Sequence, residues 1–168
     1  MFCHPDIGYI PTPPAMVLTA LAVGQVRPDD VVYDLGCGDG RVLIQAAQQF
    51  GVSGVGIEIQ PHLVAQAQAN ATTAGVRDRV IFQQGNLFDC DFRPASLVFL
   101  YLLPHLNLRL RSRLVHQLQP GSRIVSRDFD MGADWPPLRT CQVCVEDELA
   151  TLYYWEVPSP EERDRLGL

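Results

Sequence analysis

A glycine-rich turn and one glutamate are the residues of this sequence best suited to hold a ligand. The turn is Asp34-Leu35-Gly36-Cys37-Gly38-Asp39-Gly40, and it follows the apolar run 31–35. Glycines let the backbone turn tightly and let a ligand approach where a Cβ would intrude. Glu58 comes about 20 residues after Gly36, the spacing of a carboxylate that accepts hydrogen bonds from both hydroxyls of a ribose. Such a turn alone is often only structural, but with Glu58 it indicates a nucleoside-bearing ligand.

The details of the turn indicate which nucleoside it would hold. A dinucleotide fingerprint needs a third glycine where this chain has Arg41, and a Walker phosphate loop needs a lysine, of which the chain has none. Asp34 lies two residues before the first glycine. It would repel a pyrophosphate but suits a ligand that carries an ammonium. S-adenosylmethionine carries an ammonium and a sulfonium, so we expect it to be the cofactor.

The elements that must position these residues alternate between strand and helix. Apolar, β-branched runs predict strands over residues 31–35, 53–57, 80–83, 96–102 and 123–126. Apolar residues at three- and four-residue spacing predict helices over 41–50, 61–70 and 104–118. Two further β-like stretches, 140–145 and 149–157, predict a hairpin.

This order predicts an α/β fold. We expect a Rossmann-like, doubly wound, mostly parallel seven-stranded sheet with strand 31–35 central, helices on both faces, and a C-terminal antiparallel hairpin. The length of 168 residues suits one domain. We divide it into an N-terminal strap and helix (1–27), the core (28–157) and a tail (158–168).

Composition excludes several classes of protein. No apolar run is long enough to span a membrane and no secretory signal is present, so we expect a cytoplasmic protein. The net charge of −6 argues against strong nucleic-acid binding. Five scattered cysteines suit free thiols. Cys141 and Cys144 lack a second ligand pair and fit a strand, so no metal site is predicted.

The chain resembles the class I S-adenosylmethionine-dependent methyltransferases. Residues 31–40 match their first motif, a hydrophobic strand ending in Asp-x-Gly-x-Gly-x-Gly. Segments 9–13, 33–41 and 100–104 are similar to one subgroup, the small prokaryotic relatives of the lysine methyltransferases that modify the c-type ring protein of mitochondrial ATP synthase and the adenine nucleotide translocase. The similarity extends from about Tyr9 to Trp135.

The resemblance implies roles for individual residues. Asp34 would lie near the methionine moiety, Glu58 would hold the ribose, and Asn86 replaces the acidic residue that often meets the adenine. Residues 9–12 would cover the cofactor as a lid, although Thr12 could instead cap the helix that begins near Pro13. The complete expected cofactor-binding set is Thr12, Asp34, Gly36, Cys37, Gly38, Gly40, Glu58, Ile59, Asn86 and Leu87.

The resemblance also implies an acceptor, the side-chain amine of a lysine presented by a partner protein. Tyr9 and Tyr101 are the candidates for lining the methyl-transfer cleft, and no catalytic acid or base is assigned. The Asn-Pro-Pro-Phe-type motif of many amino methyltransferases is absent, and residues 101–104 occupy its place. Methylation of a small molecule or an RNA, or binding of the cofactor without turnover, are the alternatives. The sequence predicts no oligomeric state.

Overall fold

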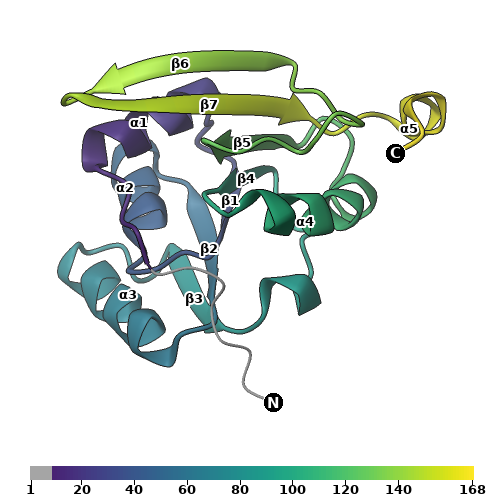
Figure 1. The fold of residues 1–168 in the computed structure, drawn as a ribbon. Helices are drawn as coiled ribbons and strands as arrows, with labels where there is room; N and C mark the ends of the chain where they lie inside the picture. The colour runs from purple at the N-terminus through teal and green to yellow at the C-terminus, as the bar shows by residue number, and fades with distance from the viewer. Residues whose placement is uncertain (1–8) are drawn as a thin grey trace.

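The computed structural model describes residues 9–168, and within that range seven strands form a single sheet (Figure 1). The strands are β1 (Val31–Leu35), β2 (Ser53–Glu58), β3 (Val80–Gln84), β4 (Leu97–Leu100), β5 (Arg123–Arg127), β6 (Arg139–Val145) and β7 (Glu148–Glu156). Their order across the sheet is β3-β2-β1-β4-β5-β7-β6. The first five strands pair in parallel, and β7 pairs antiparallel with both β5 and β6. The predicted fold class, with its C-terminal hairpin, is confirmed.

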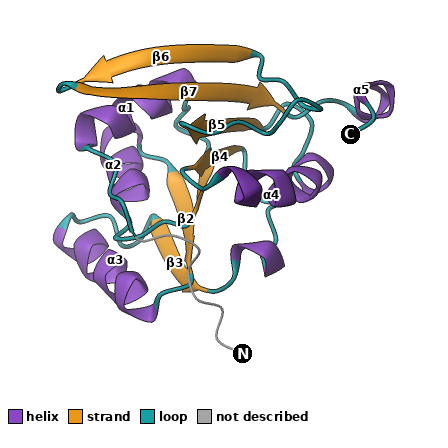
Figure 2. Cartoon of the chain, viewed as in Figure 1, coloured by secondary structure: helices purple, strands orange, loops and turns teal. Residues whose placement is uncertain are grey.

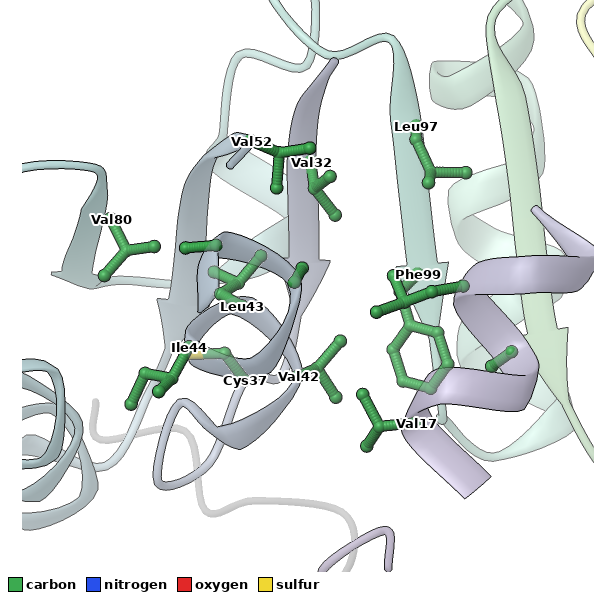
Figure 3. Close-up of a cluster of buried hydrophobic side chains, with 14 of the residues drawn as sticks. Val17, Val32, Cys37, Val42, Leu43, Ile44, Val52, Val80, Leu97 and Phe99 are labelled. Atoms are coloured by element: carbon green, nitrogen blue, oxygen red, sulfur yellow. The ribbon is translucent and has the colours of Figure 1, made fainter. Parts of the chain in front are cut away.

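Helices pack against both faces of this sheet (Figure 2). They are α1 (Pro14–Val23), α2 (Arg41–Phe50), α3 (Pro61–Thr73), α4 (Pro104–Gln117), α5 (Pro160–Leu166) and the short 3₁₀ helix η1 (Leu87–Asp89). α1, α2 and α3 contribute buried apolar residues to one cluster, part of which Figure 3 shows. α4 buries Leu106, Leu110 and Leu114 in a second cluster on the other face. α2 ends at Gly51, whose φ of 70° closes the helix in the left-handed conformation.

One expectation about the sheet was wrong. β4, not β1, is the central strand, and β1 lies beside it. Only η1 stands between β3 and β4, in a segment for which the sequence predicted no helix. Val80 and Phe82 pack in the cluster that includes α3, whereas Ile81, on the other face of β3, is 58% exposed.

A buried ion pair fastens the edge of the sheet where the parallel strands begin. Arg123 of β5 pairs with Asp30, and its Nη1 also donates to the carbonyl of Gly24 at the end of α1 (3.1 Å). Asp30 accepts a further hydrogen bond from Ser96 Oγ (2.7 Å). Both charged side chains are almost fully buried. This network joins α1 to the beginnings of β1, β4 and β5.

The ends of the chain add little to this framework. Residues 1–8 of the predicted strap, including Cys3, lie outside the described residues. The predicted tail contains α5, which begins with a capping box formed by Ser159 and Glu162. Within residues 9–168, no helix combines the length and apolar character that crossing a membrane requires.

Candidate active site

A cavity of about 350 Å³ opens where the parallel strands end, next to β1. The chain leaves β1 and β4 toward opposite faces of the sheet, through α2 and α4, and such a switch point leaves a crevice beyond the strand ends. The lining comes from the strap, the glycine-rich turn, the segments after β2, β3, β4 and β5, and the beginning of α4. It comprises Tyr9, Ile10, Pro11, Thr12, Asp34, Gly36, Cys37, Asp39, Arg41, Val42, Ile57, Glu58, Ile59, Gln60, Gly85, Asn86, Leu87, Phe88, Phe99, Tyr101, Leu102, Leu103, Leu106, Arg109 and Phe129.

The three glycines of the turn have different surroundings. All have positive φ: 84° at Gly36, 54° at Gly38 and 81° at Gly40. Gly36 lines the cavity, whereas the other two do not. A Cβ on Gly38 would lie 2.3 Å from the ring of Tyr9, and one on Gly40 would lie 2.5 Å from the ring of Phe82. Gly40 is thus required by the start of α2 and by packing against β3, and its contact with the cofactor stays a prediction, as does that of Gly38.

Asp34 presents a carboxyl group to the cavity from the interior of the sheet. The residue is 3% exposed, and its carboxyl group accepts no hydrogen bond from residues 9–168. Burial raises the pKa of Asp34 to about 8, and the nearby carboxylates of Glu58 and Asp39 add to the rise. A cationic ligand in the cavity would favour the ionised form.

Glu58 is oriented by the backbone. Its Oε2 accepts from the N–H of Gly38 and its Oε1 accepts from the N–H of Gln60, each at 3.0 Å. A carboxylate oxygen has two acceptor positions, so both oxygens can still accept from a ligand in the cavity. The glycine turn and Glu58, far apart in the sequence, are therefore joined before any ligand binds.

The strap is tied to the glycine-rich turn by Arg41. The guanidinium makes two hydrogen bonds to the Asp39 carboxylate (3.0 and 2.8 Å) and one to the carbonyl of Thr12 (3.3 Å). Burial and a hydrogen bond to Asp39 raise the pKa of Tyr9 to about 12. Thr12 does not cap α1, because the N-cap is Pro13 and no side chain caps it. The spacing of the motif did not predict the role of Arg41.

The cavity wall beyond β3 combines apolar side chains with the amide of Asn86. Ile59, Asn86 and Leu87, which were expected to bind the cofactor, line the cavity. Asn86 Oδ1 already accepts from the N–H of Phe88 (3.0 Å), which leaves one acceptor position on that oxygen. The guanidinium of Arg109, from α4, lies 3.9 Å from the centroid of the Phe88 ring. Neither Phe88 nor Arg109 was predicted, because neither belongs to a motif.

Aromatic side chains line the cavity beyond β4 and β5. Tyr101 follows β4, as predicted for a cleft residue, and Phe129 follows β5. Asp128 has φ of 64°, which turns the chain sharply before Phe129. Asn107 of α4 donates to the Phe129 carbonyl (3.1 Å) and so fixes that turn. The loop carries no periodic pattern that would have revealed Phe129.

Comparison with known proteins assigns the chain that forms this cavity to a family. Residues 34–139 match the ANTKMT methyltransferase domain. The chain belongs to this methyltransferase family. A protein-lysine N-methyltransferase of Saccharolobus islandicus is 40% identical, over 83% of this chain and 86% of that protein. The mouse adenine nucleotide translocase lysine N-methyltransferase is 32% identical over 79% of this chain, which spans only 57% of that protein.

A solved structure supports the same assignment. An RNA methyltransferase from Salinibacter ruber, in complex with S-adenosylhomocysteine, superposes with a TM-score of 0.83 at 50% identity, covering 89% of this chain and 95% of that one. The family resemblance deduced from the motifs is therefore confirmed. The protein is an S-adenosylmethionine-dependent methyltransferase.

Proposed function

We propose that this methyltransferase transfers the methyl group to the side-chain amine of a lysine in another protein. The observation that carries the proposal is the similarity over most of both chains to a protein-lysine N-methyltransferase. Relatives that are named lysine methyltransferases of the adenine nucleotide translocase and of ATP synthase support it.

The residues of the cavity fit the cofactor in three places. Asp34, buried without a partner among the described residues, suits the methionine ammonium. The free acceptor positions of Glu58 suit the two ribose hydroxyls. Ile59, Asn86 and Leu87 suit the adenine, to which the Asn86 oxygen has one acceptor position left. The strap, through Thr12 and Tyr9, would exclude water from the methionine end.

Positioning would supply most of the rate. The cofactor contributes an activated methyl group, and the protein's part is to bring a nucleophile in line with it. A lysine with a reference pKa of about 10.4 must first lose a proton. Tyr101, Phe129 and Leu102 make the wall beside the strap largely apolar, and such surroundings favour the neutral amine. No side chain is assigned as a dedicated base.

Carboxylates beyond β5 support a cationic acceptor segment. The register of β5 and β7 pairs Arg127 with Leu152, so Glu148 and the turn at Glu146 and Asp147 extend past the end of β5, on the edge of the sheet that holds the cavity. Figure 1 shows this hairpin turn projecting on the side toward which β5 points. Negative charge at this edge would speed the approach of a lysine-rich segment, and the effect should weaken above about 0.1 M salt.

The acceptor can be identified with a labelled cofactor. The protein is incubated with methyl-labelled S-adenosylmethionine and a cell extract, and the extract is then separated into protein, RNA and small molecules. We expect label on lysine side chains of proteins, located by proteolysis and mass spectrometry. The Glu58→Ala variant should transfer much less label, because its affinity for the cofactor is expected to fall. Asp91→Asn, at an exposed ion pair, should transfer as the wild type does.

Other locations of the label would contradict the proposal in distinct ways. Label only in RNA would favour the activity named for the Salinibacter ruber structure. Label only in small molecules would favour the remaining enzymatic alternative. Cofactor binding without any transfer would favour a binding module. The cytoplasmic location is likewise a proposal, which fractionation of cells would test.

A further inference from the structure

The register of β4 and β5 brings Arg127 beside a wall of the cavity. Leu97 pairs with Arg123 and Phe99 pairs with Val125. Continued by two residues, the same register brings Tyr101, the residue after β4, beside Arg127, the last residue of β5. Side chains of neighbouring strands on one face lie side by side, and the guanidinium carbon of Arg127 is 4.4 Å from the centroid of the Tyr101 ring. Tyr101 lines the cavity, and the arginine packs behind it.

Arg127 is poorly satisfied for a buried cation. Its side chain is 3% exposed; it pairs with Glu148, and its Nε lies 3.3 Å from Asp128 Oδ2. Its Nη1 has no hydrogen-bond acceptor in the described part of the chain. A buried donor without a partner costs free energy, and an apolar side chain would fill the same space without that cost. Compared with an apolar side chain, the guanidinium gains a cation–π contact with the Tyr101 ring.

The hairpin holds Arg127 from the other side. Glu148 is the first residue of β7. Asp128 donates its N–H to the Thr151 carbonyl (2.7 Å) and accepts from the Thr151 N–H through Oδ1 (3.0 Å). These contacts clamp the end of β5 to β7. A continuous set of contacts thus runs from the hairpin through Arg127 to the wall of the cavity.

We propose that Arg127 is a positioning residue for methyl transfer, which fixes the ring of Tyr101 and makes the β6–β7 hairpin part of the acceptor side of the site. The proposal rests on the assignment of Tyr101 to the acceptor cleft. A ring without the guanidinium behind it would adopt other rotamers, and the wall that guides the acceptor would lose its shape. Displacement of a reacting group by about 1 Å can lower a rate by about a hundredfold.

The same strand supplies a matched control. Arg123 is also buried, also paired with a carboxylate, and lies at the opposite end of β5, away from the cavity. The variants Arg127→Met and Arg123→Met therefore remove the same charge from the same strand. Each is assayed well below its unfolding temperature, with labelled cofactor and the extract fraction that accepts label from the wild type.

We expect Arg127→Met to lower acceptor turnover by about tenfold and to leave the Kd for S-adenosylhomocysteine within about twofold of the wild-type value. Arg127→Lys should restore most of the rate, since an ammonium can still contact the ring. Tyr101→Ala should also lower turnover, and the double variant should be no slower than Tyr101→Ala alone. Arg123→Met should keep the wild-type rate. Glu148→Gln should lower acceptor turnover by a smaller factor, about threefold. Because this side chain is partly exposed, the variant should fold readily.

Two results would overturn the proposal. In the first, Arg127→Met and Arg123→Met slow the enzyme equally, or Glu148→Gln has no effect, which would make the role of Arg127 purely structural. In the second, the losses from Arg127→Met and Tyr101→Ala multiply in the double variant. An unchanged acceptor rate in Tyr101→Ala would instead remove the cleft assignment itself. The lysine proposal is judged separately, by where the label resides.

Discussion

The buried carboxyl of Asp34 should make cofactor binding depend on pH. Its burial raises its pKa to about 8, with a further contribution from Glu58 and Asp39. In the free protein at neutral pH the group is therefore mostly protonated. An ammonium bound beside it favours the ionised form, so binding should release a proton to the solvent.

The size of the effect follows from that pKa. Below about pH 8 each unit of pH changes the ionised fraction of Asp34 about tenfold, so the affinity for S-adenosylhomocysteine should rise about tenfold per unit between about pH 5.5 and 7.5. The rise should level off near pH 8. Calorimetry in two buffers of different ionisation enthalpy should show about one proton released per ligand at about pH 6.5. Asp34→Asn should bind more weakly, with no pH dependence in this range.

Stability gives an independent readout with a definite sign. The folded protein binds the Asp34 proton more tightly than the unfolded chain, whose aspartates titrate near about 3.9. The contribution of this group to the free energy of unfolding therefore falls as pH rises from about 4 to about 8. Asp34→Asn should remove that decline and unfold at a higher temperature than the wild type at about pH 8. A flat affinity profile, with no proton released, would refute the reasoning.

Three further predictions concern single contacts. Glu58→Ala should weaken S-adenosylhomocysteine binding in calorimetry, because hydrogen bonds to a charged group contribute about 1.5–3 kcal/mol each; unchanged affinity would remove Glu58 from the site. Gly40→Ala should lower the unfolding temperature more than Gly51→Ala, since a Cβ would collide with Phe82 at the first position and meets nothing within 4 Å at the second; equal losses would mean that positive φ alone matters. Asp30→Asn should cost about 3–5 kcal/mol in denaturant unfolding, because it leaves Arg123 buried without its counterion. The control Asp91→Asn, at an exposed ion pair, should leave the denaturant midpoint unchanged. If Asp30→Asn changed the midpoint as little as this control, the buried pair would not be stabilising.

The sequence predicted those parts of the fold that repeat a simple pattern. The strands from β1 to β5 and the hairpin were predicted because buried strands are continuous apolar runs and the turns between them are punctuated by glycine and proline. The exposure of Ile81 was missed because helices were expected on both faces of the sheet, whereas only η1 stands between β3 and β4.

The candidate site was predictable where a motif fixes the backbone. Asp34, Gly36 and Glu58 were placed by spacing alone, and all three line the cavity. Arg109 and Phe129 were not, because they reach the cavity from a helix and a loop whose positions depend on tertiary packing. The only local signal near Phe129 is the acidic residue before it, and aspartate tolerates the left-handed turn found there.

The edge of the sheet where the parallel strands begin serves stability, and the edge where they end holds the functional site. At the edge where the parallel strands begin, Asp30 and Arg123 are fully paired, and the surrounding carbonyls and hydroxyls are satisfied. At the opposite edge the chain holds Asp34 without a partner among the described residues, Arg127 with an unpaired donor and Asp128 with positive φ. Such costs persist only where the rest of the fold enforces them, and they are characteristic of sites that bind and react. Substitutions of Asp30 or Arg123 should therefore change stability without changing affinity, and substitutions of Asp34, Arg127 or Asp128 should change affinity or rate with little loss of stability.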